Sequence, residues 1–238
     1  MRIARALALA GVDSRRKCEV LVSAGRVTVD GEPVTDLARQ VDPAVQEIRL
    51  DGRPLSFGQA IYYLFHKPAG VTTTAADPHA ARTLYDALPA GLRAKGEGRV
   101  FPVGRLDRET TGLLLLTSDG ELANRMTHPR HQVERVYEAR LDRPPAPADL
   151  ERLARGVQLE DGPARPKTVR RGAGGTVRLT LCEGRKREVR RLFEAIGYSV
   201  TRLKRTAFGP LELGDLPEGA GRFLSEAEVA WLKREVKG

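Results

Sequence analysis

Cysteine and long apolar runs are scarce in this chain, and each scarcity excludes a class of protein. The 238 residues include two cysteines, Cys18 and Cys182, and neither belongs to a C-x-x-C pair or a Cys/His cluster. This argues against a disulfide framework and a zinc site, and we expect both thiols to be buried. No apolar stretch approaches the roughly 20 residues that span a bilayer, and no secretion signal opens the sequence. We therefore expect a soluble, cytoplasmic protein with no membrane partner.

Acidic residues are outnumbered, and the excess of basic residues is unevenly distributed. The chain has 40 Lys and Arg against 31 Asp and Glu, a formal charge of +9. Residues 165–205 hold 13 basic and 3 acidic side chains, and residues 1–26 hold six basic and two acidic ones. Two separate basic segments fit a polyanionic partner such as nucleic acid better than a random solvated surface.

The length and one polar stretch predict two domains. A chain of 238 residues exceeds a typical single domain of roughly 100–200 residues, and 41% hydrophobic residues suffice for a core. Residues 51–59 are polar and include Gly52, Pro54 and Gly58, a composition typical of a linker. We place a boundary near residue 58, which divides the chain into domains 1–58 and 59–238.

The first domain reads as two short helices followed by a hairpin. Apolar residues at helical spacing stop at Gly11, and Ser14 is a good cap for a second helix that ends at Gly25. Residues 26–29 and 32–34 then flank Asp30-Gly31, a strong hairpin signal. One interpretation is an ordinary helical pair and hairpin packed on a larger body.

The run GVDSRRKCEVLVSAGRVTVDGEPV favours a more specific interpretation. It resembles the S4-type RNA-binding domain shared with a small-subunit ribosomal protein. The resemblance covers about fifty residues and implies that the basic side chains of the helix pair contact RNA phosphates. These side chains are Arg15, Arg16, Lys17 and Arg26.

The second domain contains the most informative stretch of the sequence, VGRLDRETTGLLLLTSDGELANRMTHP. Leu113 to Leu116 predicts a buried strand, and a helix is expected to begin near Glu121. Asp107 therefore lies in a loop just before a buried strand, where a rigid scaffold can present it to a cleft. Taken alone, an R-L-D-R segment favours the interpretation that Asp107 is a surface carboxylate paired with Arg105 or Arg108.

Four motifs in register resemble the RsuA/RluB family of ribosomal RNA pseudouridine synthases. They are GRLDRETTGLLLLTSDG, ELANRMTHPRHQVERVYEARL, EGRKREVRRLFEAIGY and RLKRTAFGPLELGDLPEGAGRFLSEAEV. The resemblance implies that Asp107 is the essential catalytic residue. It favours large-subunit ribosomal RNA, or a precursor of the ribosomal subunit, as the substrate and partner, with a small-subunit enzyme as the alternative.

The implied reaction needs only protein side chains. Pseudouridine formation breaks the bond between ribose and uracil nitrogen, turns the base and rejoins it through carbon, without net oxidation. No cofactor and no metal are expected, in agreement with the absence of a nucleotide-binding Gly-rich loop and a metal-ligand cluster from the sequence. Asp107 could attack the sugar, attack the base or remove a ribose proton, and the sequence leaves all three open.

The basic segment EGRKREVRRLFEAIGY predicts an amphipathic helix with Leu192 and Phe193 inward. By the resemblance, Arg190 forms a salt bridge with Asp107, and Val189 lies under the target base. Glu188 departs from the Gln that relatives often carry. The other cations of this segment are assigned to contacts with the substrate: Arg185, Lys186, Arg187 and Arg191.

Three further residues complete the expected site. Tyr137 lies on a predicted strand, where a Tyr usually packs half-buried, and the resemblance implies that it stacks on the target uracil. Arg105 and Lys67 are assigned to substrate contacts, although the Lys67-Pro68-Ala69-Gly70 segment could equally be a structural turn.

The fold implied by the resemblance is α+β, with a small S4-like domain followed by a catalytic domain on a mixed, mainly antiparallel sheet. A capping box from Ser225 to Glu228 predicts a final helix with Val229, Leu232 and Val236 inward. We expect a monomer. Two other classes remain as alternatives, a non-catalytic RNA-binding protein of ribosome assembly and a metal-dependent nuclease.

Overall fold

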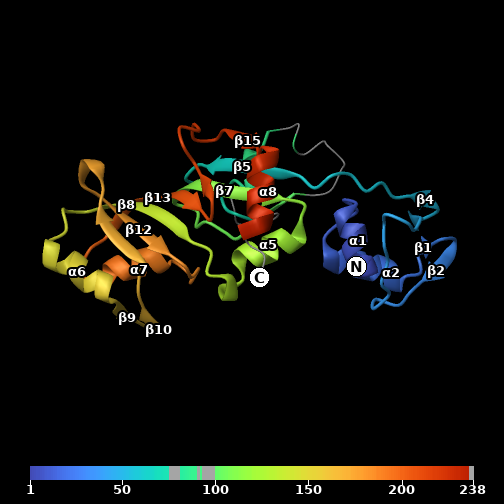
Figure 1. Cartoon of the computed structure of the whole chain (residues 1–238), viewed down its shortest axis with the longest axis horizontal. Coiled ribbons are helices and arrows are strands. Elements are labelled where there is room, and N and C mark those ends of the chain that lie inside the picture. The colour runs from blue at the N-terminus through green and yellow to red at the C-terminus, as the bar shows by residue number, and fades with distance from the viewer. Residues whose placement is uncertain (75–80, 90–91, 93–99, 236–238) are drawn as a thin grey trace. The chain divides into compact units, whose positions relative to one another are not determined.

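The computed structural model describes residues 1–74, 81–89, 92 and 100–235 (Figure 1). The chain forms two compact units. Unit 1 comprises Met1–Tyr62, Pro89–Phe101 and Thr117–Asp119, and unit 2 comprises Tyr63–Leu88, Pro102–Leu116 and Gly120–Gly238. The predicted boundary near residue 58 stays a prediction.

Unit 1 contains the predicted helix pair and hairpin. Its helices bury Ile3, Leu7, Cys18 and Val22 against the sheet, whose strand order is β2-β1-β3-β4. Asp30 and Gly31 both have positive φ, the conformation that a two-residue hairpin turn requires. The elements are α1 (Ile3–Leu9), α2 (Arg15–Ser23), β1 (Val27–Val29), β2 (Glu32–Val34), β3 (Ile48–Leu50) and β4 (Arg53–Pro54).

Three details predicted from the sequence need correction. The linker was predicted to begin at residue 51, but Arg53–Pro54 pairs with β3, and Leu55 and Phe57 pack against the unit 1 core. Ser14 occupies the N-cap of α2 without making a side-chain capping bond. Cys18 is buried as expected, whereas Cys182 is only partly buried.

Unit 2 is built on a mixed sheet of nine strands, in the order β11-β12-β8-β13-β7-β5-β15 with β6 and β14 at the side. Of the pairs with a defined register, β13 with β7 is parallel and the others are antiparallel. This confirms the α+β class. The strands are β5 (Tyr62–Lys67), β6 (Phe101–Pro102), β7 (Thr110–Thr117), β8 (Arg135–Leu141), β11 (Thr168–Arg171), β12 (Thr176–Leu181), β13 (Val200–Phe208), β14 (Leu211–Glu212) and β15 (Gly221–Phe223).

Further elements surround this sheet. A separate hairpin consists of β9 (Val157–Leu159) and β10 (Gly162–Ala164). The helices are α3 (Leu84–Ala87), α5 (Gly120–Thr127), α6 (Pro147–Arg155), α7 (Glu188–Glu194) and α8 (Glu226–Glu235), with 3₁₀ turns at Pro129–His131 and Ala173–Gly175. No helix in these described ranges is long and apolar enough to cross a bilayer.

One face of the sheet is apolar at one end and polar at the other. Side chains alternate along a strand, so the odd-numbered residues of β8 share a face. Ala139 and Leu141 pack there in a buried cluster with α6 and α7, which lie on one side of β8, β12 and β13 (Figure 1). Arg135 and Tyr137 continue the same face beyond this cluster, and it is there that a pocket opens.

The last helix follows its predicted capping box. Ser225 N–H donates to Glu228 Oε2 over 2.8 Å, and Glu228 N–H donates to Ser225 Oγ over 3.3 Å. Leu232 is fully buried and Val229 half-buried, while Val236 lies outside the described residues.

Candidate active site

Asp107 lies in the loop that leads into β7, and the segment after β5 holds this loop in place. Thr73 Oγ1 donates to the carbonyl of Leu106 over 2.8 Å. Gly70 N–H and Lys67 Nζ both donate to the carbonyl of Arg108, over 2.9 and 3.2 Å. Backbone carbonyls on both sides of Asp107 are thus bonded, so the carboxylate is presented by a loop with little freedom to move.

A pocket of about 530 Å³ opens beside Asp107. Tyr137 contributes its wall from β8, and Val189 contributes an apolar surface from α7. Three of the residues predicted for catalysis and for contact with the base, Asp107, Tyr137 and Val189, therefore line one cavity in unit 2. The volume lies in the range of cavities that hold small ligands, and a single nucleotide is of that size.

The pocket has a basic rim. Arg105 lies on one side, and Lys186 and Arg187 lie on the segment between β12 and α7; all three are exposed pocket-lining residues. Arg185 also lines the pocket, but its guanidinium donates to Glu183 and to the carbonyl of Pro163, over 2.6 and 2.9 Å. Arg108 is exposed and lines the pocket as well, 3.4 Å from Glu109. Exposed cations around one cavity suit it to an anionic polymer.

Three cations expected at the site lie elsewhere. Arg190 does not line the pocket, and its Nη1 donates to the carbonyl of Val200 over 2.7 Å. Asp107 forms no ion pair with Arg190 or with any other residue that the structure describes. Arg191 is paired with Asp161 over 2.8 Å. Lys67 is fully buried beneath the loop of Asp107, and burial lowers the pKa of its ammonium to about 8.

Two buried arginines take part in the site although the sequence did not assign them to it. Arg205, 1% exposed, and Arg135, 8% exposed, both line the pocket, and their guanidinium carbons lie 4.7 and 5.1 Å from the centre of the Phe208 ring. A signal for Arg205 was present in the sequence. In VTRLKRTAF it alternates with Leu203 and Ala207, the positions of an inward strand face, where an arginine is unusual.

Glu188, which departs from the family pattern, is a buried carboxyl at the edge of the pocket. It is 7% exposed, and burial raises its pKa. Its Oε2 accepts from the backbone N–H of Arg185 over 3.2 Å. The side chain therefore anchors the turn that carries the basic rim.

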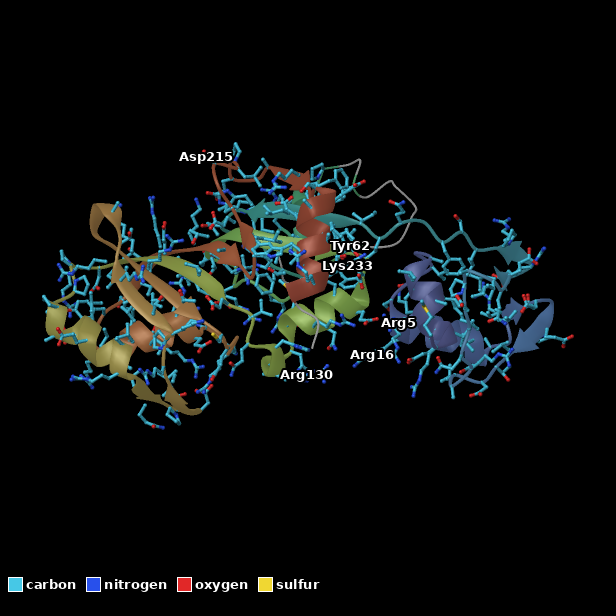
Figure 2. All side chains as sticks on the ribbon, viewed as in Figure 1. Arg5, Arg16, Tyr62, Arg130, Asp215 and Lys233 are labelled. Atoms are coloured by element: carbon cyan, nitrogen blue, oxygen red, sulfur yellow. The ribbon has the colours of Figure 1, made fainter. Side chains whose placement is uncertain are left out.

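The basic side chains predicted for unit 1 differ in how free they are. Arg26 is held by Asp51 over 2.9 Å, Lys17 by Asp13 over 3.2 Å, and Arg15 lies 3.4 Å from Glu19. Arg16 is exposed and lies on the helical side of the unit, away from the β1–β2 hairpin (Figure 2). Exposed ion pairs contribute little, so these pairs can open to bind phosphate.

Comparison with known proteins assigns the family. Residues 61–195 match the RNA pseudouridylate synthase family, and residues 1–46 match the S4 domain. The chain belongs to the RNA pseudouridylate synthases. This pseudouridine synthase is 41% identical to an uncharacterized RNA pseudouridine synthase of Aquifex aeolicus (strain VF5), over 99% of this chain and 95% of the relative.

Other similar proteins extend over the whole chain as well. Ribosomal large subunit pseudouridine synthase B of Bacillus subtilis (strain 168) is 38% identical over 98% of this chain and 95% of its own length. A crystal structure described as a pseudouridylate synthase superposes with a TM-score of 0.68 at 29% identity, covering 98% of this chain and 99% of that one. The pseudouridine synthase is thus similar to these relatives in both its S4 and its catalytic parts.

Proposed function

We propose that this pseudouridine synthase isomerises one uridine of large-subunit ribosomal RNA, with Asp107 as its catalytic carboxylate. The observation that carries the proposal is the pocket in which Asp107, Tyr137 and Val189 meet beneath an exposed basic rim. The relatives named for the large ribosomal subunit support the choice of RNA. We further propose that the enzyme works as a cytoplasmic monomer on ribosomal RNA or a subunit precursor.

A carboxylate, an aromatic ring and an aliphatic surface have different roles in this pocket. A uridine must leave its stack to reach Asp107, and Tyr137 offers a flat ring for the flipped uracil, with Val189 on the apolar side. The carboxylate then acts as a nucleophile toward the sugar or base, or as a base toward the ribose. Each route keeps the uracil in the pocket while it turns.

Arg190 is proposed as a cation that reaches Asp107 once RNA is bound. Its Nε is buried and has no partner, so the guanidinium retains a free donor. To reach Asp107 it must give up the bond from Nη1 to the carbonyl of Val200. Pairing with an ionised carboxylate would compensate for that loss, since bonds to charged groups are stronger than neutral ones.

Tritium release from ribosomal RNA labelled at carbon five of uracil tests the proposal. The wild-type protein should release tritium from large-subunit RNA, and Asp107→Asn should release none while its RNA affinity stays within a few-fold. Glu109→Gln is the matched control, because Glu109 is an exposed carboxylate of the same loop paired with Arg108. Release from small-subunit RNA alone would reassign the substrate, and turnover by Asp107→Asn would reject the catalytic carboxylate.

A further inference from the structure

Arg205 is a buried cation with a hydrogen-bond donor that has no partner. Its Nε donates to the carbonyl of Leu113 over 2.8 Å, while its Nη2 is buried without a hydrogen-bond partner. Arg205 forms no ion pair in the ranges that the structure covers. A buried, unpaired guanidinium donor is costly, so its retention indicates a ligand that arrives later.

The pocket around Arg205 contains a second buried guanidinium, which increases the free-energy cost of burying the positive charge of Arg205. Arg135 uses its donors on the backbone carbonyls of Val133, Cys182, Glu183 and Met126, none of which carries a net charge. Burial lowers the pKa of Arg135, and the neighbouring Arg205 also lowers it, while Tyr137 and Glu188 raise it. Two buried guanidinium groups therefore line the pocket, and the Nη2 of Arg205 is a donor without a partner.

Strand register places this donor beside the ring expected to hold the base. Arg205 is the direct cross-strand partner of Tyr137 on β8 and of Gly112 on β7. Directly opposed residues in a sheet share a face, and both Arg205 and Tyr137 line the pocket. A uracil stacked on Tyr137 would have Arg205 as its neighbour at the floor.

The depth of Arg205 favours the base over the phosphates as its ligand. Arg205 is 1% exposed, whereas Lys186 and Arg187 at the rim are exposed and available to the RNA backbone. A flipped nucleotide enters its pocket base first, and its phosphates stay with the strand outside. The group that reaches the floor is therefore the uracil ring.

The chemistry creates negative charge on that ring by every route open to Asp107. When the C1′–N1 bond breaks, its electron pair passes to N1 and through the ring to O2 and O4, while C1′ bonds to the carboxylate or a proton passes from C2′ to it. If the carboxylate first adds to C6, the electrons of the C5–C6 double bond move toward O4, and the C1′–N1 bond then breaks with its electron pair on N1. On each route C5 bonds to C1′, C5 loses its proton to solvent and N1 takes one up, and any bond or proton taken by Asp107 is returned.

We propose that Arg205 is a further catalytic residue, whose Nη2 donates to a carbonyl oxygen of the target uracil and stabilises the negative charge that develops there. The role is that of an oxyanion-hole donor, fixed in place before the reaction by the bond from Nε to Leu113. It rests on the proposed function, since it requires a uracil in the pocket of Asp107.

The first test compares single-turnover rates and RNA affinities of Arg205→Met, Arg205→Lys and the control Arg202→Met. Arg202 lies on the same strand but is exposed and does not line the pocket. Loss of a preorganised donor should slow Arg205→Met by roughly 100- to 1000-fold, with RNA affinity within about threefold and Arg202→Met unchanged. Arg205→Lys, which keeps the charge, should recover part of the rate. The RNA is first selected by wild-type tritium release, so a wrong substrate appears before any variant is compared.

The second test changes the substrate and identifies the oxygen. Target RNAs with 2-thiouridine or 4-thiouridine replace one carbonyl oxygen by sulfur, a weaker acceptor, and each is assayed with wild-type enzyme and with whichever Arg205 variant folds. With one of these RNAs the slowing caused by the variant should shrink at least tenfold, because the bond is already weakened. An equal slowing on all three RNAs, or a loss of affinity that accounts for the whole loss of rate, would overturn the proposal.

Discussion

Gly112 is predicted to be indispensable because the backbone of Arg205 occupies the place of its missing side chain. Gly112 has φ +110°, and a Cβ built on it would lie 2.2 Å from the carbonyl oxygen of Arg205. Real Cβ atoms essentially never approach closer than 3.0 Å, so Gly112→Ala must push β13 away by about 0.8 Å. That movement displaces Arg205, which the structure holds between Gly112 and Tyr137.

The expected loss of stability has two parts. An alanine at positive φ costs about 1–2 kcal/mol, and forcing extra atoms into a packed site costs roughly 1–3 kcal/mol more. A total near 3 kcal/mol lowers the melting temperature by roughly 6–12 °C in a protein of this size. A displacement near 1 Å beside the reacting groups should also slow single turnover by about 100-fold.

Gly162→Ala is the matched control for this prediction. Gly162 has the same φ of +110°, but a Cβ there meets nothing within 4 Å, so this variant carries only the backbone strain. It should lose about 1–2 kcal/mol and keep its turnover rate. Circular dichroism melts and tritium release measure both quantities. If Gly112→Ala melted and reacted like Gly162→Ala, the close approach of β7 and β13 would not matter for the site.

Other substitutions separate the remaining cations by role. Arg190→Met should lower turnover at least tenfold more than Arg191→Met, because the guanidinium of Arg191 already has a carboxylate partner in Asp161, whereas that of Arg190 bonds to the backbone carbonyl of Val200. Equal rates would remove Arg190 from the site. The pKa of Lys67 is about 8 in the folded protein against 10.5 when free. Between these two pH values the stability of the wild type should therefore rise relative to that of Lys67→Met, by about 1.4 kcal/mol per pH unit. Parallel curves of stability against pH for the two proteins from pH 7 to 10.5 would refute this. The double variant Arg15→Gln, Arg16→Gln should reduce the slope of log RNA affinity against log salt concentration by about 1.4, because each phosphate contact to a single strand contributes roughly 0.7. An unchanged slope would assign α2 to another partner.

Local patterns in the sequence were enough to place Asp107. The apolar run of Leu113 to Leu116 predicts a buried strand, and Asp107 lies in the loop before it in the structure as well. Helical spacing likewise predicts that Leu192 and Phe193 are buried, and both are. These features depend on periodicity within a few residues, which a sequence displays directly.

The roles of the individual cations could not be predicted in the same way, because they depend on contacts between segments that are distant in the sequence. Arg190 and Arg205 are both arginines of a basic segment, yet the first bonds to the carbonyl of Val200 and the second to that of Leu113 on another strand. Lys67 bonds to the carbonyl of Arg108, 41 residues away. Which carbonyl a guanidinium or ammonium reaches is decided by strand order and register, and a single sequence does not encode these in any short pattern.

The position of the pocket follows from the separation of two strands. Strand β13 pairs with β7 only from Leu203 to Arg205, and its register with β8 shifts between Arg205 and Ala207. Beyond that point β6 pairs with β7, and Val103 N–H donates to the carbonyl of Leu115 over 2.8 Å. A register shift bends a strand locally and is common beside active sites.

The separation of β13 from β7 explains why the segment from Val103 to Asp107 both pairs with β7 and lines the pocket. The chain that pairs with β7 through Val103 continues directly into Gly104 and on to Asp107, so the loop of Asp107 begins where β13 departs. Arg205 is the last residue of β13 paired with β7, and its Nε bonds to the carbonyl of Leu113 just past the end of that pairing. A hydrophobic side chain at position 205 could fill the space but would leave that carbonyl without its bond, at a cost of about 1–3 kcal/mol for a buried acceptor. An arginine satisfies the carbonyl with one nitrogen and still keeps a second donor, the unpartnered Nη2, in a side chain that lines the pocket, which a lysine or glutamine of similar length cannot do with the same fixed geometry.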